Sequence, residues 1–145
     1  MKKEIVEMLV KTDQIRIRQA DFEKIKSMIQ SAKINAKIAM SVPLNDDSAT
    51  LIFREVYESI RQLGDAKWWL VGFEPRNHEV SMDILKEANI KEKVILNRLS
   101  RFKRIRNDAN YRGFRVSVEQ AKEIIDFWNN CAKEIIGEIS GISHL

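Results

Sequence analysis

Apolar side chains recur at the spacing of an α-helix in four long segments of the chain. In the first, from Asp21 to about Ser41, they alternate at intervals of three and four residues: Phe22, Ile25, Ile29, Ala32, Ala36 and Ala39. Asp21 is typical of a helix N-cap, and Val42-Pro43 predicts the end of the helix. Residues 3–19 predict one or two shorter helices, with these apolar contacts: Ile5, Met8, Leu9 and Ile15.

The second long segment follows a short polar link, Asn45–Ser48, that offers capping side chains and negative charge. Its apolar stripe consists of Ala49, Phe53, Val56, Ile60, Leu63 and Leu70. Gly72 and then Pro75 predict the end of this helix. Because the link is short, the first two long helices should pack antiparallel.

The rest of the chain predicts a loop over 73–77, a short helix from Glu79 to Ala88, and a long helix from Lys91 to Tyr111. Ser117–Gln120 has the pattern of a capping box before the last helix. The buried face of that helix should hold Ala121, Ile124, Trp128, Ala132, Ile135 and Ile139. No segment needs a β-strand. The pattern predicts one all-α domain, 1–145, of about five helices, with an extension at 1–20 and a tail at 140–145.

Composition narrows the class of protein. The 145 residues are 44% hydrophobic and 32% charged, which suits one globular domain. A single cysteine excludes an internal disulfide, and with two distant histidines it leaves no zinc site, so we expect no metal and no cofactor. The chain has neither an apolar signal-peptide core nor about 18 consecutive apolar residues. We therefore expect a cytoplasmic protein with no membrane partner.

Positive charge is concentrated in residues 98–115. This segment holds seven basic residues against Asp108 alone: Arg98, Arg101, Lys103, Arg104, Arg106, Arg112 and Arg115. Its net charge is +6 in a chain of +4, so the other residues together carry −2. Such a patch attracts polyanions, such as RNA or nucleotide phosphates. The alternative is a solvated helix face that meets acidic residues elsewhere in the chain.

Arg106 differs from the other basic residues in its position on the helix. The apolar stripe of the segment is formed by Ile95, Leu99, Phe102 and Ala109, and Arg106 falls inside it. A guanidinium facing a core must find acceptors, or else it lines a cleft or an interface. One interpretation is an ion pair with Glu55 or Glu58; the other is a binding cleft that Asn107, Asn110 and Tyr111 help to line.

The residues Arg106-Asn107-Asp108-Ala109-Asn110-Tyr111 resemble the Arg-x-x-Ala-Asp-Tyr signature of HEPN domains. Upstream, the helix at 49–70 followed by Gly72, Pro75 and His78 is similar to a second pattern of this family. The resemblance covers about residues 22–136. It implies an up-and-down antiparallel bundle of about five helices that usually forms homodimers. Members act as metal-independent ribonucleases, often toxins paired with a nucleotidyltransferase-like antitoxin, or they bind RNA or nucleotides without cleavage.

This chain departs from the catalytic form of the family, in which four to six residues separate the arginine from a histidine that follows it. Those positions hold Tyr111, Arg112 and Gly113, and Asn110 replaces the common aspartate. Histidine, with a pKa of about 6.5, transfers protons near neutral pH, whereas tyrosine, with a pKa near 10, would need a strongly perturbed pKa to do so. We therefore expect RNA or nucleotide binding with weak or lost cleavage, in a toxin–antitoxin or defence system. The expected binding residues are Arg106, Asn107, Asn110, Tyr111, Arg98, Arg101 and Arg112.

Two alternatives stay open: a divergent ribonuclease that uses Arg106 with Tyr111 or His78, and a protein-interaction module. His78 could supply acid–base chemistry if the fold brought it near Arg106; the simpler interpretation is a helix cap or a hydrogen bond across a loop. At most one of Trp68 and Trp69 should be centred on the core; the other should be exposed, partly covered or in a dimer interface, of which we favour the interface.

Two further expectations concern the last helix and the short helix at 79–88. Cys131 should be buried as a small hydrophobic residue. An acidic edge on the short helix could meet the basic helix; it consists of Glu79, Asp83 and Glu87.

Overall fold

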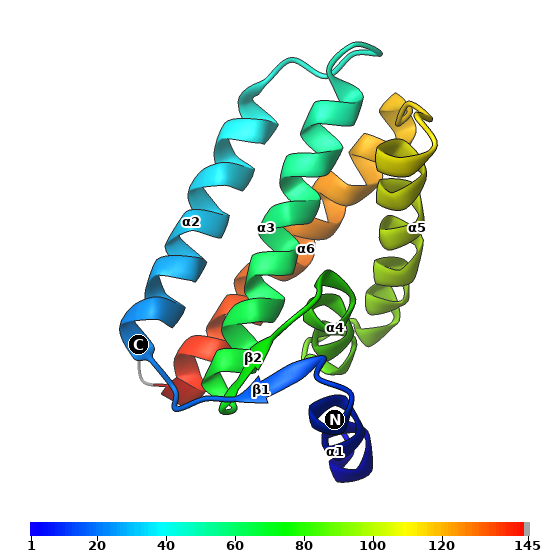
Figure 1. Ribbon diagram of the computed structural model, residues 1–145. Helices are drawn as coiled ribbons and strands as arrows, with labels where there is room; N and C mark the ends of the chain where they lie inside the picture. The colour runs from blue at the N-terminus through cyan, green and yellow to red at the C-terminus, as the bar shows by residue number, and fades with distance from the viewer. Residues whose placement is uncertain (144–145) are drawn as a thin grey trace.

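Three long helices run side by side in a computed structural model that describes residues 1–143 (Figure 1). They are α2 (Phe22–Ser41), α3 (Ala49–Leu70) and α6 (Val118–Ser143). The central helix, α3, packs against both α2 and α6, and α5 (Arg98–Tyr111) lies beside it on the other flank. The prediction of a mainly helical chain is confirmed. Within residues 1–143, no helix has both the length and the apolar content that a membrane crossing requires.

The ends of the helices follow from local chemistry. The Asp21 carboxylate accepts a hydrogen bond from the Lys24 amide at 3.1 Å, which confirms the predicted N-cap of α2. The Ser117–Gln120 capping box is also confirmed, because each side chain accepts a hydrogen bond from the other residue's amide, at 3.0 and 3.1 Å. Gly72, just after α3, has φ +95°, a left-handed conformation that favours glycine.

The expectation that no segment forms a β-strand was wrong. The N-terminal segment forms α1 (Lys3–Lys11) and then β1 (Ile15–Ile17), which pairs antiparallel with β2 (Phe73–Pro75), with Ile15 opposite Pro75. The segment at 73–77, predicted as a loop, therefore includes a strand. A three-residue strand is too short to show an alternating pattern, and its partner lies far away in the sequence.

The region between α3 and α5 is more broken than the sequence predicts. The short helix expected over 79–88 consists of α4 (His78–Asp83) and a 3₁₀ turn (Ile84–Glu87). The helix expected from Lys91 begins with another 3₁₀ turn, Lys93–Asn97, before α5. The described residues therefore contain six α-helices, one more than about five. The predicted tail is helical as far as Ser143, and His144 lies outside the described residues.

Both tryptophans of α3 belong to the core, which corrects the expectation that one would lie in an interface. Trp68 is 1% exposed, and its indole N–H donates to the Val80 carbonyl at 2.6 Å. Trp69 is 8% exposed and carries the Lys24 ammonium 4.1 Å from its ring centroid. Adjacent residues can both be buried here because α3 has neighbours on several sides. Cys131 is buried, as predicted.

Gly64 lets α4 approach α3 closely. A Cβ atom at this position would lie 1.8 Å from the Ser81 carbonyl oxygen, a backbone atom that cannot rotate away. The two helices can therefore touch only because residue 64 has no side chain. This contact places the start of α4, with His78, beside α3.

We expect Gly64→Ala to destabilise the protein by about 1–3 kcal/mol, because the added methyl group must push α4 away from α3. Glycine-to-alanine substitution inside a helix is otherwise stabilising by up to about 1 kcal/mol. Gly137 in α6 supplies the matched control, since its added Cβ would meet nothing within 4 Å. Urea unfolding of both variants checks the prediction. Equal stabilisation by the two substitutions would contradict it.

Candidate functional site

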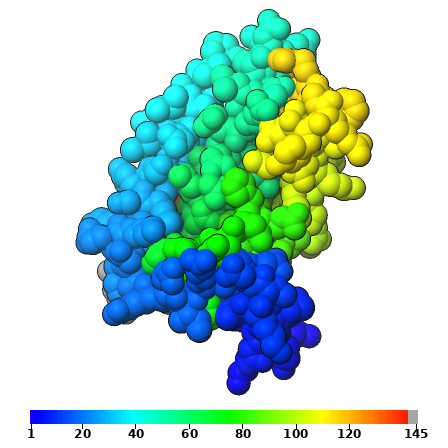
Figure 2. Space-filling view, in the orientation of Figure 1, coloured from blue at the N-terminus to red at the C-terminus, as the bar shows by residue number. Residues whose placement is uncertain are grey.

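A polar cleft of about 310 Å³ opens where α3, α4 and α5 meet. Its lining comes from all three helices: Tyr57, His78, Glu79, Lys103, Arg106, Asn107 and Tyr111. The end of α5, drawn yellow, and α4, drawn green, border this region of the surface (Figure 2). The fold therefore brings together four of the residues predicted from the sequence, which are Arg106, Asn107, Tyr111 and His78.

Arg106 is half-buried and has no carboxylate partner. Its guanidinium carbon lies 5.8 Å from the centroid of the Tyr57 ring, which is a cation–π contact. Within residues 1–143 it forms no ion pair and no hydrogen bond. Of the two carboxylates considered for it, Glu55 is exposed and Glu58 is bound to Arg61. The structure therefore contradicts the predicted ion pair with Glu55 or Glu58, and it places Arg106 in a cleft.

The α4 side of the cleft begins with His78 in the first turn of that helix. His78 does not cap the helix, since Asn77 is the N-cap and accepts a hydrogen bond from the Val80 amide at 3.0 Å. Glu79 lies 3.3 Å from the Lys103 ammonium, so the predicted meeting of the acidic edge with the basic helix is confirmed at this residue. The other two members of that edge pair elsewhere: Asp83 with Lys86, and Glu87 with the N-terminal amine.

Tyr57 is a lining residue that the sequence reasoning missed. It is 3% exposed and stacks on Phe53 within α3. Burial raises the pKa of its hydroxyl to about 12, although the positive charge of Arg106 acts in the opposite direction. The only signal in the sequence was a tyrosine at a core position of the second long segment, where the apolar stripe predicts a purely apolar side chain.

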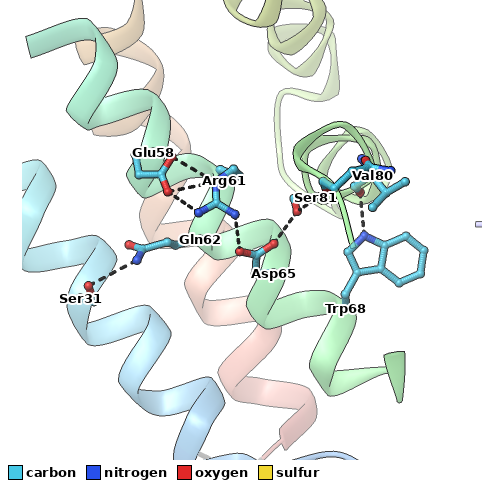
Figure 3. A network of polar contacts seen from close by, with 9 residues as sticks. Ser31, Glu58, Arg61, Gln62, Asp65, Trp68, Val80 and Ser81 are labelled. Carbon is cyan, nitrogen blue, oxygen red and sulfur yellow. Dashed lines mark hydrogen bonds and ion pairs between the residues drawn. The ribbon is translucent and has the colours of Figure 1, made fainter. Parts of the chain in front are cut away.

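Behind the cleft, a chain of polar contacts joins α3 to α4 (Figure 3). Arg61 donates to Glu58 at 3.0 Å and to Asp65 at 2.7 Å, and the Ser81 hydroxyl donates to the other oxygen of Asp65. Burial acts to raise the pKa of Glu58, but the hydrogen bonds and charge of Arg61 outweigh it and lower the pKa. For Asp65, burial prevails and raises the pKa. This network joins α4 to α3, and within it Glu58 is paired with Arg61 and not with Arg106.

The remaining predicted binding residues lie outside the cleft lining. Arg98 is exposed, and Arg101 pairs with Glu123 of α6 at 3.1 Å. Arg112, the residue that caps the end of α5, lies 4.0 Å from Asp108 of that helix. Asn110 accepts a hydrogen bond from Arg54 of α3 at 2.7 Å. Arg54 adds a cation near the end of α5 that the sequence pattern did not single out.

The arrangement suits an anionic ligand. Arg106 offers a planar set of donors that matches a phosphate, and Asn107 adds an amide beside it. Lys103 is already paired with Glu79, so Arg106 supplies the uncompensated charge. Exposed Tyr111 at the rim offers an aromatic face for a base, and His78 offers a group that can accept or donate a proton.

No protein-family model matches the chain, and neither a curated protein nor a solved structure is significantly similar to it.

We expect the absorbance of phenolate to show one tyrosine ionising near pH 12, and Tyr57→Phe to remove this step. The unfolded chain loses the same proton near pH 10. Folding stability from this group is therefore present below about pH 10 and is lost as the pH rises toward 12. Tyr111→Phe is the control and should keep the late step. Complete ionisation of both tyrosines by pH 11 in a still helical protein would contradict the prediction.

Proposed function

We propose that the protein binds RNA or a nucleotide through the cleft between α3, α4 and α5, with a phosphate group at Arg106. The observation that carries this proposal is the position of Arg106, which lies over the Tyr57 ring, faces the cleft and lacks an acidic partner in the described chain. Holding a cation in a half-buried site without a carboxylate is costly, and a bound phosphate would offset that cost.

The resemblance to HEPN domains supports the same function from an independent direction. Arg106, Asn107 and Tyr111 lie in the segment that resembles the HEPN signature, and all three line the cleft. On this basis we propose that the protein acts in the cytoplasm as a homodimer, in a toxin–antitoxin or defence system. A nucleotidyltransferase-like antitoxin is the partner that this resemblance suggests.

A second candidate function is metal-independent cleavage of RNA. It is favoured by one observation, namely that His78 lines the same cleft as Arg106 although the two residues are far apart in the sequence. His78 would accept the proton of the 2′-hydroxyl group as this oxygen bonds to phosphorus, and would return the proton to the 5′-oxygen as the P–O5′ bond breaks. Arg106 would stabilise the charge that develops on the phosphate. In this version a histidine from α4 replaces the one missing after Arg106 in α5.

We expect Arg106→Ala to weaken binding of single-stranded RNA about tenfold or more, because a charge-assisted contact to phosphate is lost. The slope of log affinity against log salt concentration should also fall by about one. Fluorescence anisotropy with a labelled oligonucleotide at several salt concentrations provides the measurement.

Arg104→Ala is the matched control for that experiment, because Arg104 is exposed, lies on the same helix and does not line the cleft. Circular dichroism and thermal unfolding confirm that both variants are folded. Equal effects of the two substitutions would show that only general charge matters. If the folded wild-type chain binds neither RNA nor nucleotides, the third class, a protein-interaction module, would take the place of this proposal.

Cleavage is tested separately, with wild-type protein and RNA in the presence of a chelator. If His78 transfers the proton, His78→Gln should abolish cleavage while leaving RNA affinity within about twofold, because the phosphate contact at Arg106 remains. Tyr111→Phe distinguishes the other candidate acid–base group. Cleavage that survives both Arg106→Ala and His78→Gln would point to a contaminating nuclease. It would exclude the proposed ribonuclease mechanism at Arg106 and His78.

A further inference from the structure

A second concave surface, the α2–α6 groove, lies between the outer faces of α2 and α6 and encloses about 400 Å³. Its floor is apolar and is formed by Met40, Trp128, Ala132 and Ile136. Trp128 is 9% exposed, and its indole N–H has no hydrogen-bond partner among residues 1–143. The groove therefore offers an apolar surface with one free donor. It is separate from the cleft at Arg106, since the two share no lining residue.

Three lysines border the α2–α6 groove: Lys33 and Lys37 from α2, and Lys133 from α6. All three are exposed, and none forms an ion pair or a hydrogen bond within the described part of the chain. No acidic residue lines the groove. By contrast, Lys67 of α3 is paired with Glu138 of α6 at 2.7 Å. The rim thus carries uncompensated positive charge around an apolar floor.

The charge pattern decides which kind of occupant fits. A second copy of the chain bound symmetrically would place the same lysines against one another, which is unfavourable. The phosphates of a nucleic acid would pair with the three lysines, but a nucleic acid would offer no apolar surface to cover the floor. An amphipathic helix with an apolar stripe flanked by carboxylates satisfies both features, because its stripe covers the floor and its acidic residues meet the lysines.

We infer that the α2–α6 groove is a docking site for an acidic amphipathic helix of a partner protein. The apolar stripe of that helix packs on Trp128 and Ile136, and its carboxylates pair with Lys33, Lys37 and Lys133. The inference does not depend on the proposed RNA binding, because it uses another face of the molecule.

The first experiment measures binding of a synthetic helical peptide to the full chain by fluorescence anisotropy. The peptide carries leucines three and four residues apart, flanked by glutamates; a second peptide has lysine at every glutamate position. We expect the acidic peptide alone to bind. The double variant Lys33→Glu, Lys37→Glu should weaken it about tenfold or more, since like charges then face one another. Lys93→Glu, an exposed position outside the groove, is the control and should leave affinity unchanged.

The second experiment places a photoreactive amino acid at Asn129, which lines the groove and is exposed, in the cells that make the protein. We expect cross-links to a protein segment that is acidic and amphipathic, with the yield reduced in the Lys33→Glu, Lys37→Glu variant. A product formed with a second copy of the chain, with nucleic acid or with membrane lipid would overturn the inference. Equal affinity for the two peptides would overturn it as well.

Discussion

The contact between α4 and α3 at Gly64 is the constraint on which the cleft depends. The Ser81 carbonyl occupies the space where any other residue at position 64 would place its Cβ atom. The Ser81 hydroxyl, on the same residue, donates to Asp65 of α3. One residue of α4 is therefore held both by the shape of α3 and by a hydrogen bond. As a result His78, one turn earlier, lies next to the wall of α3 that carries Tyr57.

The distribution of carboxylates around this contact determines which cation is available in the cleft. Arg61 engages Glu58, and Glu79 engages Lys103. These pairs leave Arg106 facing the cleft with only an aromatic ring beneath it. An exposed ion pair contributes little to folding stability. These pairs matter because they determine which cation in the cleft is left without a carboxylate partner. They leave Arg106 without an ion pair within residues 1–143, although, against the effect of burial, its charge still acts on Glu58 and helps Arg61 to lower the pKa of that carboxyl.

Much of the helical framework could be predicted from the sequence because its signals are local. The apolar stripe of α6 and the capping box at Ser117 each depend on residues within a turn or two of each other. The strands at 15–17 and 73–75 could not be predicted in this way. Each is three residues long, and its pairing joins segments that are almost sixty residues apart. The break of the predicted short helix into α4 and a 3₁₀ turn likewise depends on packing against α3.

The candidate site was predictable in part. The position of Arg106 in an apolar stripe indicated its inward direction, and Asn107 and Tyr111 followed from the same helix. The position of His78 in the cleft could not be predicted from the sequence, because it depends on how closely α4 packs on α3. Gly64 did indicate a close contact in the sequence, because glycine inside a helix lowers helix stability by about 1 kcal/mol relative to alanine and is usually offset by packing. Tyr57 was hidden because its ring fits an apolar stripe as well as phenylalanine does.

The use of carboxylates along α6 has a consequence for the electric field outside the protein. Glu138 binds Lys67 and the Asn89 amide, Glu134 binds the Lys91 amide, and Glu123 pairs with Arg101. Each of these anions is directed toward the chain's own cations and backbone donors. Lys133, with Lys33 and Lys37 of α2, therefore keeps no carboxylate partner within residues 1–143 and presents its charge to an approaching molecule. A long-range attraction of this kind increases the rate of encounter before any specific contact forms, and salt weakens it.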